Sequence, residues 1–171
     1  MNFQEFLESR NACQDAQEWA KDKTIEQAID QCHRGDWLIW LAQKLEVDKR
    51  LLVGTAGYCA NTVRHLMKYE RSKSCVDVCI AYAKGDANDE ELAEAKAAAR
   101  VASWAAASAR AASTDWDEAS VVARAATAAA SWDGVWAVAA AEAAAKSKNQ
   151  KQIADICREH LKKAMIEKWN K

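Results

Sequence analysis

Proline is absent from this 171-residue chain, and glycine occurs only five times. Because these two residues mark most turns, their scarcity argues against an all-β sandwich, which needs many turns. It also excludes collagen-like chains and linkers rich in proline, glycine or serine. A chain of this length suits one hydrophobic core. We therefore expect a single domain, residues 1–171, built from helices.

The sequence also lacks a long hydrophobic run and an export signal. Its longest uncharged stretch, 51–63, has 13 residues, whereas a membrane span needs about 20 apolar residues. The first residues have neither the basic region nor the apolar region of a secretory signal. The six cysteines are therefore expected to stay reduced. We predict a cytoplasmic protein that does not contact a membrane.

An overall excess of positive charge is lacking as well. The net charge is −1, so no basic field predicts binding to duplex nucleic acid or to an anionic membrane. Basic residues gather near the C-terminus, where residues 146–171 hold eight Lys and Arg against three Asp and Glu. The pattern over 149–170 predicts a basic amphipathic helix. Its cations suit either a solvated face near a helix C-terminus or a contact with an acidic partner.

What the chain has in abundance is alanine. Between residues 93 and 145, 26 of 53 residues are alanine, the strongest helix former. Small side chains let helix axes approach closely, and the tryptophans of this segment supply bulk. We expect closely packed helices here, and exposed alanine faces would suit assembly into a homo-oligomer.

Capping residues predict where several helices begin and end. Thr24 followed by Gln27 and Asn88 followed by Glu91 have the spacing of capping boxes. Gly85 predicts a helix end. Two further N-caps are expected at Asp36 and Asp48, and a helix over about 48–69 is expected to loosen near Gly54 and Gly57. The sequence predicts an all-α bundle of seven to nine helices, with a mixed-core half over 1–85 and an alanine-rich half over 86–171.

No catalytic or metal-binding constellation is visible. Cys75 and Cys79 are four residues apart, but a zinc site needs four ligands and no second compact pair exists. Cys59 and His65 are six residues apart and would lie on opposite sides of a helix. Nucleophile signatures and phosphate-binding glycine loops are missing. We predict no metal site, no cofactor and no enzymatic activity.

The most distinctive stretch is residues 32–42, Cys-His-Arg-Gly-Asp-Trp-Leu-Ile-Trp-Leu-Ala. Arg34 and Asp36 flank an expected turn between two helices, where they would pair with each other or with a ligand. Trp37 and Trp40 are three residues apart, so they share one helix face. The stretch predicts either a structural corner or a binding site formed by these four residues.

The chain resembles the Imm-5-like immunity proteins of bacteria and their phages in the order of its segments: Cys13 and Trp19, then this stretch, then Arg50-Leu51-Leu52, Cys59-Ala60 and the long alanine-rich half. Arg-Gly-Asp-Trp-x-x-Trp-Leu is the specific part of the resemblance. It implies an all-α protein without an established catalytic set that binds and neutralises a toxin. The resemblance marks Arg34, Asp36, Trp37 and Trp40 as family positions without assigning them a role.

Two functional hypotheses follow. The first is a non-catalytic protein that occludes a toxin or effector through a few Trp and Arg anchors. The alternative is a phage-encoded anti-defence protein that binds a bacterial defence protein or sequesters a nucleotide signal. Sequestration needs an aromatic ring for the base and cations for the phosphates, which Trp37 with Arg34, or Trp104 with Arg100, would supply. A concave pocket lined by one such pair would favour sequestration over simple occlusion.

Overall fold

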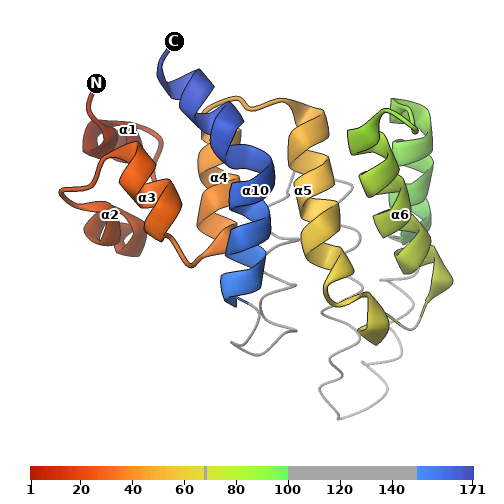
Figure 1. The fold of residues 1–171 in the computed structure, drawn as a ribbon. Helices are drawn as coiled ribbons and strands as arrows, with labels where there is room; N and C mark the ends of the chain where they lie inside the picture. Colours follow the sequence, from red (N-terminus) through yellow and green to blue (C-terminus); the bar gives the residue numbers. More distant parts are fainter. Residues whose placement is uncertain (68, 100–149) are drawn as a thin grey trace.

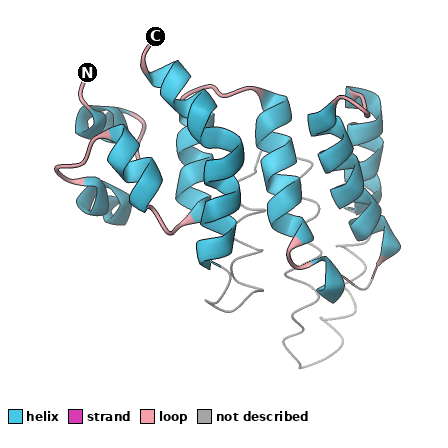
Figure 2. Cartoon of the chain, in the orientation of Figure 1, coloured by secondary structure: helices cyan, strands magenta, loops and turns pink. Residues whose placement is uncertain are grey.

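Helices run through almost all of the described chain (Figure 1). The computed structural model describes residues 1–67, 69–99 and 150–171, and these residues contain no β-strand (Figure 2). The predicted all-α bundle is confirmed. Most of the alanine-rich segment, with Arg100, Trp104 and the expected oligomer surface, lies outside the described residues. Every helix that the structure describes is too short or too polar to span a lipid bilayer.

The helices that precede residue 100 follow one another across the bundle. Three short helices, α1 (Phe3–Ser9), α2 (Gln14–Ala20) and α3 (Ile25–Gln31), form one end. They are followed by α4 (Gly35–Lys44) and α5 (Lys49–Asn61).

A short 3₁₀ turn, Arg64–Leu66, leads from α5 into α6 (Glu70–Lys84), which packs against α5 at the other end of the bundle. Residues 89–99 are also helical. Neighbouring helices in the chain are therefore mostly neighbours in space.

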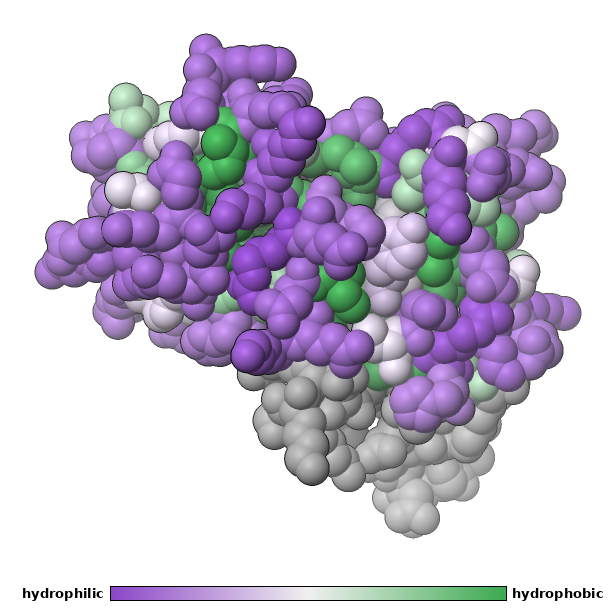
Figure 3. Space-filling view, in the orientation of Figure 1, coloured by the Kyte–Doolittle hydropathy of each residue, from purple (hydrophilic) through white to green (hydrophobic). Residues whose placement is uncertain are grey.

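The last helix, α10 (Gln150–Trp169), lies beside α4 in Figure 1 and packs on α3, α4 and α5. One face of α10 is completely buried: Ile153, Ala154, Cys157, Leu161 and Met165. On the side shown in Figure 3, hydrophobic areas are small and hydrophilic ones separate them. Helix α10 thus belongs to the same hydrophobic core as residues 1–85, because its apolar face packs into that core.

The predicted capping residues set four helix boundaries. Thr24 and Asn88 each accept a hydrogen bond from the backbone N–H three residues on, and each donates its own N–H to the side chain there. Asp48 accepts a backbone N–H at the start of α5. Gly85 has a φ of 85° and terminates α6. Local sequence signals decide these boundaries.

The prediction that α5 loosens near its two glycines was wrong. The helix continues through Gly54 and Gly57, and α6 packs directly against them. A Cβ atom at Gly54 would lie 2.2 Å from the Cβ of Ala83, and one at Gly57 would lie 2.9 Å from the Cβ of Cys79. The glycines therefore permit a close approach of two helices that a larger side chain would prevent.

Replacing Gly54 with alanine should lower the free energy of unfolding by about 1–3 kcal/mol, because α5 and α6 must separate to admit the methyl group. At an exposed helix position the same replacement of glycine by alanine would raise the stability by about 1 kcal/mol. A lower free energy of unfolding therefore identifies the contact between the two helices as the cause. Denaturant unfolding measures the change. The additional substitution Ala83→Gly removes the opposing methyl and should recover most of the loss; equal losses with and without it would contradict the packing argument.

Left-handed backbone occurs at residues other than glycine. Asn11 has a φ of 55° and Glu46 a φ of 57°, and they follow α1 and α4. In both cases the N–H of the left-handed residue bonds the carbonyl three residues back, and the next N–H bonds the carbonyl five residues back. This is the Schellman helix end, where glycine is the usual residue. Asn11 and Glu46 thus occupy positions where glycine is the usual residue. The scarcity of glycine in the chain therefore does not mean that tight helix ends are absent.

Glu46→Gly should raise the free energy of unfolding by about 1 kcal/mol, because glycine adopts a left-handed φ without the Cβ clash. Denaturant unfolding of the wild type, Glu46→Gly and Glu46→Ala measures the effect. Alanine has the same clash as glutamate and serves as the control. A glycine variant no more stable than the alanine variant would show that Glu46 is not strained.

Candidate functional site

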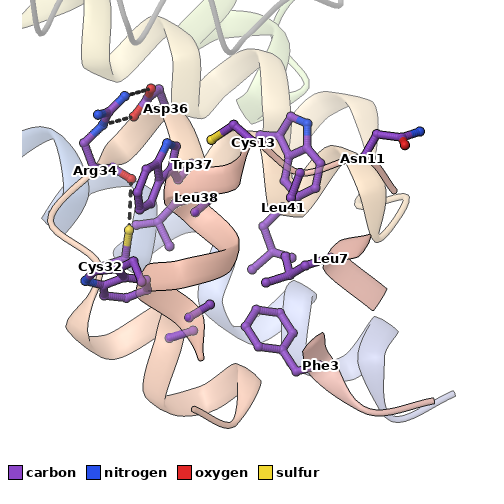
Figure 4. A pocket seen from close by; sticks show the side chains of 16 residues that line it. Phe3, Leu7, Asn11, Cys13, Cys32, Arg34, Asp36, Trp37, Leu38 and Leu41 are labelled. Atoms are coloured by element: carbon purple, nitrogen blue, oxygen red, sulfur yellow. Dashed lines mark hydrogen bonds and ion pairs between the residues drawn. The ribbon is translucent and has the colours of Figure 1, made fainter. Parts of the chain in front are cut away.

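A cavity of about 380 Å³ lies between α1, α2, α3 and the beginning of α4. Its walls are mainly apolar: Phe3 and Leu7 of α1 face Leu38 and Leu41 of α4 across it (Figure 4). Two short connections, 11–13 and 32–34, complete the wall. The helices that form the cavity are short, so each of them contributes only a few of the side chains in the wall.

The structure brings all four predicted site residues to this cavity: Arg34, Asp36, Trp37 and Trp40. Their expected local geometry needs one correction, because Asp36 is not the N-cap. Helix α4 begins at Gly35, so Asp36 lies in the first turn. A carboxylate there is favoured by the helix dipole, and its oxygens are directed to Arg34 instead of to the backbone.

Arg34 and Asp36 form a two-point ion pair. Nε of Arg34 donates to Oδ1 of Asp36 at 2.9 Å, and Nη2 donates to Oδ2 at 2.6 Å (Figure 4). The Asp36 side chain is 11% exposed and that of Arg34 37%. The guanidinium also lies 4.8 Å from the centre of the Trp37 ring. The pair therefore fixes both charges and holds one face of Trp37.

Trp19 of α2 completes the aromatic wall. Its ring centre lies 5.9 Å from that of Trp37 at an interplanar angle of 59°, and the ammonium of Lys23 lies 4.8 Å from the Trp19 ring centre. Trp19 was among the residues that carry the family resemblance, but it was not predicted to be a site residue. Its place on an apolar helix face was visible, but its proximity to Trp37, 18 residues later, depends on the packing of α2 against α4.

Two cysteines line the cavity in contrasting environments. Cys32 is buried, and its Sγ donates to the carbonyl oxygen of Arg34 at 3.3 Å. Burial raises the pKa of the Cys32 thiol to about 11. Cys13, at the start of α2, is exposed. The cavity thus has one inert thiol in its wall and one accessible thiol at its edge.

No family model, curated protein or solved structure matches this chain. In the part of the chain that the structure describes, no three His, Cys, Asp or Glu side chains gather so that they could hold a metal ion. The geometry of the cavity consequently carries the functional argument: three tryptophans, apolar walls and one internally neutralised ion pair.

Alkylation of the native protein with iodoacetamide at pH 8 should modify one thiol per chain, at Cys13. All six cysteines lie in described segments, and the other five are buried; at pH 8 the Cys32 thiol, with its pKa of about 11, is also almost fully protonated. Intact mass and peptide mapping count and locate the adducts. Cys13→Ser should remove the fast reaction, and rapid labelling of Cys32 would contradict the closed wall.

Proposed function

We propose that this chain is a non-catalytic binding protein that receives an aromatic or large aliphatic side chain of a partner protein in the cavity at Arg34–Trp40. The observation that carries the proposal is an apolar cavity with Trp19, Trp37 and Trp40 in its wall. Its volume falls in the range of roughly 300–1,000 Å³ typical of ligand pockets. Trp and Arg are also the residue types that most often dominate the energy of protein–protein binding.

The charges that line the cavity support a side chain over a nucleotide as the occupant. A concave pocket with Arg34 beside Trp37 has an aromatic wall for a base, and this favours the alternative of nucleotide sequestration. However, Arg34 is held by the carboxylate of Asp36, and no other cation lines the cavity among the described residues. A phosphate would meet a carboxylate and a neutralised guanidinium. The balance supports an uncharged, hydrophobic anchor.

The resemblance to immunity proteins supports a toxin or effector as the partner. In that hypothesis the anchor fixes the orientation of the complex, and the surrounding helical surface covers the partner's working site. Inhibition by occlusion needs no catalytic group. A pocket that is already formed before binding supports it, because no entropic cost of forming the pocket is then paid on binding.

The test uses two small probes on the complete protein: N-acetyl-tryptophanamide as a stand-in for the anchor side chain, and adenosine monophosphate. We expect N-acetyl-tryptophanamide to shift the indole ¹⁵N–H resonances of Trp19 and Trp37 and to slow alkylation of Cys13, which lines the cavity. The nucleotide should do neither. The opposite pattern, with a response that needs the phosphate group, would replace the anchor hypothesis with sequestration.

Two variants test the same site without depending on one fragile side chain. Trp37→Ala removes part of the wall, and Ala16→Phe fills the cavity from α2 while leaving its other residues in place. Both should reduce binding of the probe and of a toxin or effector partner at least tenfold, the loss typical of a central anchor. Tyr69→Ala, at a 37% exposed residue that does not line the cavity, is the control. Equal binding by all three variants would contradict the proposal.

A further inference from the structure

A second cavity, of about 420 Å³, lies where α1, α4 and α10 end. Figure 1 shows the ends of α1 and α10 close to one another at the same end of the bundle. This cavity is distinct from the first one, because the two share no lining residue. The residues that give it a chemical character are Phe6, Arg10, Lys44, Glu46, Lys168 and Trp169.

Three cations from three separate elements line this cavity. Arg10 caps the end of α1, Lys44 lies in the last turn of α4, and Lys168 lies in the last turn of α10. None of the three forms a salt bridge with a residue that the structure describes. Glu46 is the one carboxylate among the lining residues. The cavity therefore has a surplus of positive charge, in contrast to the neutral pair in the first cavity.

An aromatic ring in a fixed position lines the same cavity. Trp169 makes edge-to-face contacts with Phe3 at 6.0 Å and with Phe6 at 5.4 Å between ring centres. These contacts hold the indole before any ligand arrives. Arg10 lies 5.6 Å from the Phe6 ring centre and Lys44 lies 5.8 Å from that of Trp40, but neither they nor Lys168 are neutralised by a carboxylate of the described residues. Fixed aromatic surface next to cations that are not neutralised is the combination that recognises a planar base joined to a phosphate.

The helix ends provide a competing reason for the cations. Each helix C-terminus carries roughly half a negative charge, which a nearby Lys or Arg offsets. This effect accounts for one cation at one helix end. It does not require three such ends to share a cavity with a tryptophan. It also makes a different prediction, because loss of a cation would then lower stability and leave no phosphate binding to lose.

We propose that this second cavity binds a small organic phosphate that carries a planar ring, of the mononucleotide type. The phosphate lies between Arg10, Lys44 and Lys168, and the ring lies against Trp169. The Glu46 carboxylate opposes the phosphate and limits its affinity. This inference is independent of the anchor function, because it concerns other residues and another ligand class.

The experiment titrates the complete protein with adenosine monophosphate, adenosine and inorganic phosphate, following the Trp169 indole resonance and the heat of binding. We expect the nucleotide to shift Trp169, to bind more tightly than either fragment, and to lose affinity as salt rises. Lys44→Gln and Lys168→Gln should each weaken binding about fivefold, whereas Glu46→Gln should strengthen it by a similar factor. Loss of a positive charge would then weaken binding, and loss of the negative charge would strengthen it. Partial unfolding of the variants cannot produce this pattern, because it would weaken binding in every case.

Lys163→Gln is the matched control, because Lys163 lies on the same helix as Lys168 but does not line the cavity. It should leave the affinity unchanged. A lower melting temperature for Lys44→Gln together with no nucleotide response at Trp169 would establish that the cations serve the helix ends alone. Equal affinity for inorganic phosphate and the nucleotide would overturn the role of the ring. A nucleotide shift at Trp37 that is lost in Ala16→Phe would move the ligand to the first cavity and overturn this proposal and the anchor hypothesis together.

Discussion

The described structure depends on how α10 is bound to the connection between α3 and α4. Arg158 donates to the carbonyl oxygens of Ile29 and Cys32, at the end of α3. One residue earlier on α10, the Cys157 Sγ lies 3.7 Å from the carbonyl oxygen of Gly35, the first residue of α4. The connection that contains Arg34 is thus held at both ends by a helix more than 100 residues away in sequence. The site at Arg34–Trp40 exists because the last helix fixes the helix ends that present it.

Helices α1 and α4 contribute residues to both cavities and form the wall between them. The lining on one side of this wall differs chemically from the lining on the other. Phe3 lines the first cavity, and its ring contacts Trp169 of the second. Likewise Trp40 lines the first cavity, and the ammonium of Lys44, which lines the second, lies 5.8 Å from the Trp40 ring centre. Hydrophobic surface therefore gathers on one side of this wall, and on the other side lie three cations that form no salt bridge with a described residue. A charged ligand and an apolar side chain would not compete for the same place.

The sequence predicted what short-range interactions decide and failed where distant segments meet. Thr24 and Gly85 act on their own helix ends, so their roles could be predicted. Gly54 was misinterpreted as a weak point, because helix propensity says nothing about the Ala83 methyl that packs on it. The four predicted site residues span only seven positions and were found together. The second cavity, with Lys44 and Lys168, has no pattern in sequence, since three helix ends form it.

The cations of the basic helix α10 differ in their contacts. On a uniformly solvated face all of them would have similar surroundings, but in the structure some pair with carboxylates and others do not. Arg158 pairs with Asp155, Lys162 with Asp30 on α3, and Lys163 with Glu167; their charges contribute to the fold or are offset locally. Lys151 and Lys168 have no such acidic partner among the described residues, and of these two only Lys168 lines the second cavity. The anion proposed for the second cavity therefore concerns only the last turn of α10, where Lys168 lies. A contact of the whole basic face with an acidic partner stays a separate hypothesis, because Lys151 in the first turn has no acidic partner among the described residues either.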